Sequence, residues 1–365
     1  MSIIIFLAIL AILIFVHELG HFLVAKKSGI RVDEFGIGFP PKIFSKQWGS
    51  TLYTLNAIPF GGFVKIFGED AHSEIISDED KKNSFVFKPK WVQALVLVAG
   101  VTFNVIFAWL VISLGFFLGT TTALPHNTMG EFNDARLIIT EVLPDSPASK
   151  AGLVPGDIVV KISDGIETIS KELYPETVQK FISESSARDL RITVEDGKNS
   201  QREITLTPTI ELIPGKNVIG ISMEWIGTLK LSLLSSLTEG ARSTWYLLKA
   251  TTEGLSKFLW DTITFKSDFS QVTGPVGIAR VVKEANELGF RYLLNITAII
   301  SVNLAVINLI PFPALDGGRL LFVFIEAVIR RPINANVVKW SNLIGFAFLM
   351  LLMIAVTSHD VLKLF

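Results

Sequence analysis

The residues best suited to chemistry follow an apolar run, where charge is least expected. Residues 3–16 are apolar throughout, and His17, Glu18 and His21 come directly after them. On a helix, positions i and i+4 share one face, so the two imidazoles can bind one metal ion together, as in zinc hydrolases. Glu18 is next to the first imidazole and can reach a water on that ion. Polar groups at membrane depth are expensive and usually functional, so depth and spacing indicate the same site.

Composition indicates a membrane protein. Half of the 365 residues are hydrophobic and 18% are charged, against about 25% charged in ordinary globular chains. The net charge of −1 argues against nucleic acid as a partner. The chain has no cysteine, which excludes disulfides, thiol nucleophiles and Cys-ligated zinc. The start lacks a basic region and a small-residue cleavage site, so we expect the first segment to be retained.

Four segments are long and apolar enough to cross a bilayer. They are predicted at residues 1–26, 91–118, 293–316 and 340–357. The loop over residues 27–90 is rich in lysine, and the loop after the third segment contains Arg319, Arg330, Arg331 and Lys339. The positive-inside bias makes both loops cytoplasmic and places region 119–290 and both termini outside. The two histidines then lie near the cytoplasmic side.

The first loop contains short β segments. Residues 32–39 and 51–57 are predicted strands, which suggests β structure dipping toward the membrane. An edge strand with Val32, Phe35, Ile37 and Phe39 could clamp an extended substrate by strand addition. The alternative is a hairpin that only packs against the helices.

Residues 132–209 are predicted to form a compact extracytoplasmic domain. Strands are expected at 137–143, 158–162, 190–194 and 203–207, with a helix at 172–185. The string EVLPDSPASKAGLVPGDIVVKISDG resembles PDZ domains of bacterial envelope proteases, which bind extended peptides. The alternative is that this domain acts only as a spacer or a steric plug.

Residues 229–263 are predicted to form an amphipathic helix that lies on the outer membrane surface or against the PDZ domain.

A catalytic zinc site usually takes three protein ligands, so the histidine pair needs a partner. Asp316 ends the third apolar segment, where Pro311 and Pro313 break the helix and Gly317 and Gly318 are expected to let the backbone turn. Its carboxylate can then point inward.

Two asparagines also lie in apolar segments. Asn308 could hold a substrate backbone or stabilise an oxyanion, with helix–helix hydrogen bonding as the alternative. For Asn104 the structural role is favoured.

The chain resembles bacterial site-2 proteases of the regulator-of-sigma-E branch over nearly its whole length. The matching segments are HELGH at 17–21, EFGIGFPPKIF at 34–44, IPFGGFVKIFGED at 58–70, GPVGIA at 274–279 and NLIPFPALDGG at 308–318. The resemblance implies a polytopic α-helical membrane protein with about four transmembrane helices, a membrane-associated β region and one inserted PDZ domain. It also implies zinc held by His17, His21 and Asp316, with Glu18 as general base. The family's usual Gly-Pro start of the second-helix motif reads Gly100-Val101 here.

These features predict an intramembrane zinc metalloprotease of the bacterial inner membrane. Its substrates would be single-span membrane proteins already trimmed by another protease, such as anti-sigma factors or signal-peptide remnants. The resemblance implies that the PDZ domain excludes substrates whose outer domain is still attached. The alternatives are an inactive membrane adaptor that recruits proteins through the PDZ domain, and a metal transporter, which the absence of paired inverted repeats disfavours.

Overall fold

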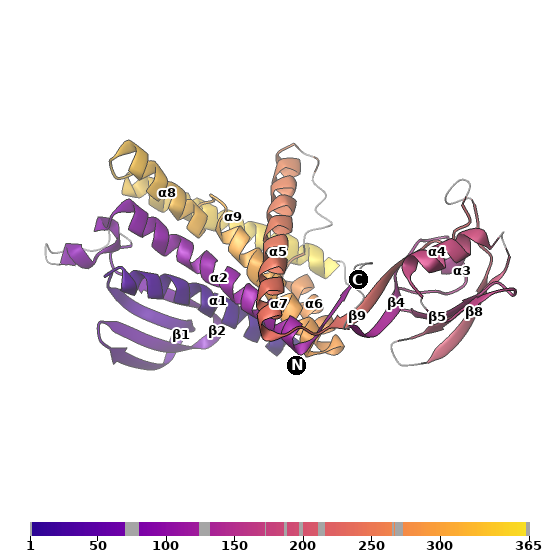
Figure 1. The fold of residues 1–365 in the computed structure, drawn as a ribbon. Helices are drawn as coiled ribbons and strands as arrows, with labels where there is room; N and C mark the ends of the chain where they lie inside the picture. The colour runs from indigo at the N-terminus through magenta and orange to yellow at the C-terminus, as the bar shows by residue number, and fades with distance from the viewer. Residues whose placement is uncertain are drawn as a thin grey trace. The chain divides into compact units, whose positions relative to one another are not determined.

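A computed structural model describes residues 2–69, 80–123, 132–171, 173–185, 188–196, 200–210, 216–264, 266 and 273–362. The chain divides into two units (Figure 1). One is mainly helical and comprises Met1–Gly115 with Leu233–Phe365; the other is rich in β structure and comprises Phe116–Ser232.

Long helices dominate the first unit. They are α1 (Ser2–Lys27), α2 (Lys90–Leu118), α5 (Leu233–Ile263), α6 (Pro275–Leu288), α7 (Phe290–Asn308), α8 (Asp316–Ile329) and α9 (Ala335–Leu362). Four helical segments are long and apolar enough to cross a membrane: Ile3–Lys27, Lys90–Leu118, Phe290–Asn308 and Ala335–Leu362. The prediction of four spans is therefore confirmed. The helix predicted at 229–263 is present as α5, which contacts α7 and accepts a hydrogen bond from Trp109 of α2 at the carbonyl of Leu237.

The third predicted span differs from the structure at its end. The segment was predicted over 293–316 with a break at Pro311 and Pro313, whereas α7 ends at Asn308 and Asp316 is the first residue of α8. Pro311 and Pro313 lie in the intervening loop, where proline cannot continue a helix. The loop also holds Ala314 in the left-handed region at φ 76°. Asp316 therefore begins a new helix, and α8 occupies sequence that was expected to be a loop.

Helix α6 was not predicted, and it is anchored from the far end of the chain. Gly274 precedes α6 and Pro275 is its first residue. The buried carboxylate of Asp360 on α9 accepts a hydrogen bond from the backbone N–H of Gly277 at 2.8 Å. Side-chain oxygens at this position satisfy the free N–H groups of a first helical turn. A Cβ at Gly274 would lie 2.8 Å from Oδ2 of Asp360, so glycine permits the approach.

We expect Asp360→Ala to destabilise the protein by about 1–2 kcal/mol, because it removes a helix cap. Asp360→Asn retains a side-chain oxygen and should lose less. Thermal unfolding in detergent measures both variants, with the exposed Glu287 of α6, changed to Ala, as control. Equal midpoints for Asp360→Ala and Glu287→Ala would contradict this role.

The first loop forms a sheet from two long strands, β1 (Val32–Trp48) and β2 (Thr51–Ile66). Both are longer than the predicted strands at 32–39 and 51–57, because β1 continues through Pro40 and Pro41 and β2 continues to Ile66. Phe35 pairs with both Tyr53 and Val64, and Gly36 pairs with both Thr54 and Phe63. The first half of β1 therefore lies between the two halves of β2.

This register corrects one prediction. Residues 32–39 were expected to offer a free edge, but residues 34–37 have partners on both sides. The reason is that β2 turns back at Gly61 (φ 124°) and pairs with β1 a second time. Among the described strands, the outer edges of this sheet are residues 42–48 and 62–66.

Aromatic packing fixes the sheet against α1. The ring of Phe22 lies 4.9 Å from that of Phe35 and 6.0 Å from that of Tyr53. Ile43, Phe44 and Trp48 of β1 are largely exposed. An exposed apolar group of this kind is typical of a surface that meets lipid or another apolar partner.

Two short 3-10 helices, η1 (Asp80–Asn83) and η2 (Phe85–Phe87), precede α2.

The β-rich unit is built on one sheet with the strand order β3-β9-β4-β5-β7-β8, and β6 pairs with β5. Its elements are β3 (Thr120–Ala123), β4 (Phe132–Val142), α3 (Pro147–Lys150), β5 (Ile158–Ser163), β6 (Thr168–Ile169), α4 (Pro175–Glu184), β7 (Leu190–Glu195), β8 (Gln201–Leu206) and β9 (Ile221–Leu229). Each predicted strand and the predicted helix fall on one of them. The core joins the sheet to α4 through Val178 and Ile182.

Candidate metal centre

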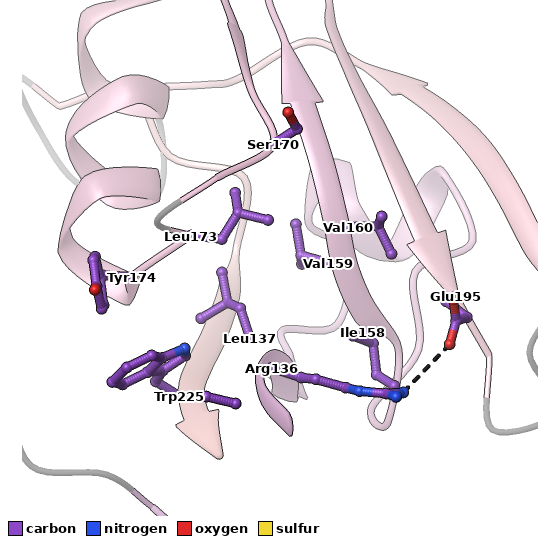
Figure 2. A pocket seen from close by; sticks show the side chains of 11 residues that line it. Arg136, Leu137, Ile158, Val159, Val160, Ser170, Leu173, Tyr174, Glu195 and Trp225 are labelled. Atoms are coloured by element: carbon purple, nitrogen blue, oxygen red, sulfur yellow. Dashed lines mark hydrogen bonds and ion pairs between the residues drawn. The ribbon is translucent and has the colours of Figure 1, made fainter. Parts of the chain in front are cut away.

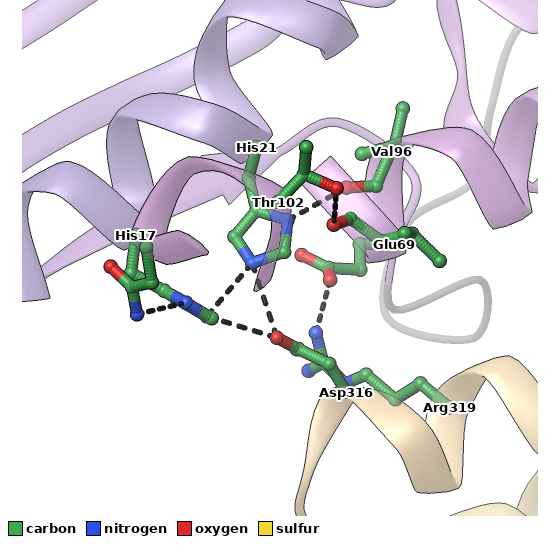
Figure 3. A network of polar contacts seen from close by, with 9 residues as sticks. His17, His21, Glu69, Val96, Thr102, Asp316 and Arg319 are labelled. Atoms are coloured by element: carbon green, nitrogen blue, oxygen red, sulfur yellow. Dashed lines mark hydrogen bonds and ion pairs between the residues drawn. The ribbon is translucent and has the colours of Figure 1, made fainter. Parts of the chain in front are cut away.

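His17 and His21 of α1 meet Asp316 at the start of α8 (Figure 3). Oδ2 of Asp316 lies 2.9 Å from Nε2 of His17 and 3.3 Å from Nε2 of His21. The two Nε2 atoms are 3.2 Å apart. Both histidines are buried and Asp316 is half-buried, so the three donor atoms form a compact group shielded from bulk water.

The size of this group fits zinc. Donor atoms about 2.0–2.1 Å from a tetrahedral zinc ion lie about 3.3 Å from one another. The three separations between the donor atoms, 2.9, 3.2 and 3.3 Å, are close to that edge length. Two imidazoles and one carboxylate are also a ligand set that catalytic zinc sites use, with the fourth position left for water.

Each imidazole is held through its second nitrogen. Nδ1 of His21 donates to the backbone carbonyl of Val96 at 2.8 Å, which leaves Nε2 free for a metal. Nδ1 of His17 lies 3.2 Å from the side-chain amide of the fully buried Asn104. Coordination through Nε2 keeps a hydrogen on Nδ1, which needs an acceptor. A half turn of the Asn104 carboxamide supplies one by bringing Oδ1 against Nδ1.

Two glycines at the contact between α1 and α2 leave space for the metal-binding side chains. A Cβ at Gly100 would lie 2.4 Å from Nε2 of His21 and 2.8 Å from Nε2 of His17. One at Gly20 would lie 2.5 Å from the carbonyl oxygen of Ala99. Glycine is therefore required at both positions because nothing larger fits. The sequence pointed to the histidines, whereas Gly100 acquires its role only when α2 lies beside α1.

We expect Gly100→Ala to lower zinc content sharply, because the new methyl group would overlap both Nε2 atoms. Gly254→Ala on α5 is the matched control, since nothing lies within 4 Å of a Cβ there. Metal analysis of the purified variants provides the measurement. Equal zinc content in both variants would show that the space beside the histidines is not restricted.

Two glycines place Asp316, for a different reason from the one expected. Gly317 and Gly318 were expected to let the backbone turn, but both lie within α8. A Cβ at Gly317 would lie 2.2 Å from the carbonyl oxygen of Ile310, and one at Gly318 would lie 2.2 Å from that of Phe312. The loop thus folds back onto the first turn of α8, and only glycine permits that contact.

Glu18 is next to His17 on α1, and its side chain lies beside the edge of the sheet. A Cβ at Gly62 would lie 3.6 Å from Cγ of Glu18. The edge formed by residues 62–66 therefore passes beside Glu18. Of the residues predicted to clamp a substrate, Val32 and Phe35 belong to the core and only Ile37 and Phe39 remain partly exposed.

The structure places the two asparagines differently with respect to the histidine pair. Asn308 is half-buried at the end of α7. Within the described part of the chain, Asn104 and not Asn308 hydrogen-bonds to the histidine pair. The sequence signal for Asn104 was its position inside an apolar helix, where a buried amide needs a polar partner.

An ion pair ties α8 to the sheet close to these donors. Arg319, one turn after Asp316, pairs with Glu69, which follows β2 (Figure 3). The carboxylate of Glu69 is mostly buried. The pair thus links the segment that leaves the sheet edge to the helix that carries Asp316.

The β-rich unit has a cavity of about 400 Å³ of its own (Figure 2). Arg136 and Glu195 form an ion pair at 3.4 Å on one side of it. Tyr174 and Trp225 pack edge to face on the other, with ring centroids 4.7 Å apart. None of the residues predicted for the catalytic site lines this cavity.

Comparison with known proteins identifies the family. The model of peptidase family M50 matches residues 5–352. The chain belongs to this family, the site-2 proteases. It is 30% identical over 441 residues to the regulator of sigma-W protease RasP of Bacillus subtilis, covering 100% of this chain and 99% of that protein. It is 31% identical over 430 residues to the zinc metalloprotease RasP of Geobacillus kaustophilus, covering 100% and 98%.

A third relative agrees with this assignment. A Clostridium perfringens protein with the provisional name of a zinc metalloprotease is 35% identical over 353 residues, covering 96% of this chain and 95% of that protein. The site-2 protease is thus a zinc metalloprotease, and its four apolar helices make it a multi-pass membrane protein. The predictions of family, enzyme class and cofactor are confirmed.

Proposed function

We propose that this site-2 protease cleaves peptide bonds in or near the transmembrane segments of single-span membrane proteins. His17, His21 and Asp316 would hold the zinc, and Glu18 would be the general base. The observation that carries the proposal is the donor triangle, whose edges of 2.9 to 3.3 Å match those of a zinc tetrahedron. The two histidines and the aspartate lie about 300 positions apart in the sequence, so local helix geometry does not explain why they are in contact.

The position of the histidines along α1 favours access to water. His21 is five residues before Lys26, or about 8 Å along the helix axis at 1.5 Å per residue. Lysines favour the membrane surface and, on the cytoplasmic side, are enriched in loops. We therefore place the site inside the apolar layer but within reach of cytoplasmic water.

The residues of the site have separate roles in peptide hydrolysis. Zinc, when bound, acts as a Lewis acid that makes water a stronger nucleophile at neutral pH and polarises the substrate carbonyl. Glu18 accepts the proton of the attacking water and passes it to the leaving amine. Val96 and Asn104 keep the imidazoles oriented, and the buried surroundings strengthen these electrostatic effects.

Substrate binding is proposed at the edge formed by residues 62–66. A transmembrane helix satisfies its own backbone hydrogen bonds, so it must unwind before hydrolysis. An open strand edge offers replacement partners for the exposed backbone groups. This edge passes Glu18 at Gly62, whereas residues 34–37 are occupied on both sides.

The β-rich unit would act on the other side of the membrane. We assign residues 132–209 to a PDZ domain outside the cytoplasm that filters substrates by size or binds a peptide. Its strands β4, β5, β7 and β8, together with α4, support this assignment. The name of the Bacillus subtilis relative, a regulator of sigma-W protease, favours an anti-sigma factor as the kind of substrate.

We expect Glu18→Gln to retain zinc and to lose cleavage by about 10²–10⁴-fold, because general-base catalysis contributes that much. Asp316→Ala should lose both zinc and cleavage. Zinc content and cleavage of a model transmembrane helix in detergent are measured together, with the exposed Glu253→Gln of α5 as control. Substantial activity in Glu18→Gln would reject the general-base role, and full zinc content in Asp316→Ala would reject the ligand role.

The same pair of measurements separates the two asparagines. Asn104→Ala should weaken zinc binding by about 10–100-fold, as is typical for loss of a partner that orients a ligand. Asn308→Ala should keep zinc and lose cleavage, if its amide contacts the substrate or the oxyanion. Normal cleavage in Asn308→Ala would leave that residue a packing role only.

A further inference from the structure

We propose that a cavity between α8 and α9 binds the headgroup of an anionic phospholipid. The cavity measures about 400 Å³ and is separate from the metal-binding donors. It is lined by Ala314, Arg319, Lys339, Asn342, Leu343 and Phe346. Two of these side chains are cationic, one is an amide and two are large and apolar.

The order of these side chains along α9 matches the shape of a lipid. Lys339 and Asn342 come first, and Leu343 and Phe346 follow on the same face at helical spacing. From Lys339 to Phe346 the helix rises about 10 Å. The wall therefore changes from charged to apolar over the distance that separates a phosphate headgroup from the start of its acyl chains.

The depth of the cavity in the membrane also fits a bound phospholipid. Trp340, beside Lys339, is 59% exposed, and tryptophan is enriched where headgroups meet hydrocarbon. Leu343 and Phe346 are 51% and 54% exposed, which suits contact with acyl chains. The apolar window of α9 is 6% buried, against 22% to 44% for the other three spans. The cavity thus opens on the helix that is most available to lipid.

Charge favours an anion at this position. The segment 316–342 carries Arg319, Arg330, Arg331 and Lys339 against Asp316 and Glu326, and Lys90 already pairs with Glu326 at 2.6 Å. Nη1 of Arg319 contacts Glu69, and the same side chain lines the cavity. Basic pockets between transmembrane helices are typical sites for anionic headgroups. A free phosphate would use the cations but would leave the apolar half of the wall without a role.

The test uses the full-length protein, purified in a zwitterionic detergent and supplied with phosphatidylglycerol, phosphatidylcholine or inorganic phosphate. Retained lipid is measured by native mass spectrometry, and protection is measured as a shift of the thermal unfolding midpoint. Wild-type protein should retain phosphatidylglycerol in preference to phosphatidylcholine and gain a higher midpoint. Lys339→Gln should weaken this retention about fivefold, the effect of one basic residue near an anionic surface. Arg319→Gln and Asn342→Leu should weaken it as well.

Arg331→Gln is the matched control, because it removes the same charge from the exposed loop beside α9 without lining the cavity. An equal loss in this control would overturn the proposal in favour of a diffuse attraction to anionic lipid. An equal midpoint shift with inorganic phosphate, or equal retention of phosphatidylcholine, would overturn it too. Phosphatidylglycerol with six-carbon chains should bind more weakly than the long-chain lipid, and equal binding would remove the part assigned to Leu343 and Phe346. These measurements do not involve cleavage, so they stand independently of the proposed protease mechanism.

Discussion

The structure depends on bringing a carboxylate and two imidazoles together inside an apolar layer. Buried polar groups are costly unless each finds a partner. Here Asp316 contacts both Nε2 atoms, Val96 accepts from His21, and Asn104 lies against His17. Each side chain of the group therefore contacts a polar neighbour, and the donors keep the spacing that a zinc ion needs.

Glycine makes this arrangement sterically feasible at several points. Gly20 and Gly100 let α1 and α2 approach until backbone and imidazoles touch. Gly317 and Gly318 let the proline-containing loop lie against the first turn of α8. The same residue type thus sets both the distance between the helices and the place where Asp316 emerges. The observed contacts explain these positions without any need for unusual backbone angles.

The sheet and α8 complete the surroundings of the site. The sheet is fixed on α1 through the rings of Phe22 and Phe35, so its outer edge passes Glu18 at Gly62. Glu69 continues from that edge and pairs with Arg319, which lies one turn from Asp316. Adjacent contacts thereby connect the strand edge proposed to hold substrate with Glu18, the proposed base, and with Asp316, the proposed third ligand. Arg319 also lines the cavity proposed for an anionic headgroup, which would lie one helical turn from Asp316.

The sequence by itself determined whatever depends on local spacing. The interval from His17 to His21 fixes both imidazoles on one helical face, the apolar runs fix four spans, and Pro311 with Pro313 fixes a break before Asp316. Alternating and helical patterns likewise predicted the strands and the helix of the β-rich unit. The zinc metalloprotease could be predicted from these features because its motifs are short and contiguous.

Only the tertiary structure decided what depends on packing between distant segments. Residues 32–39 look like an edge strand until β2 turns back and covers their second side. Asn104 and Asn308 are equivalent as polar residues in apolar helices, and only the approach of α2 to α1 sets Asn104 against His17. Helix α6 depends on a carboxylate 83 positions away, Asp360. Spacing along a chain specifies which face a residue occupies, but not which other segment will lie against that face.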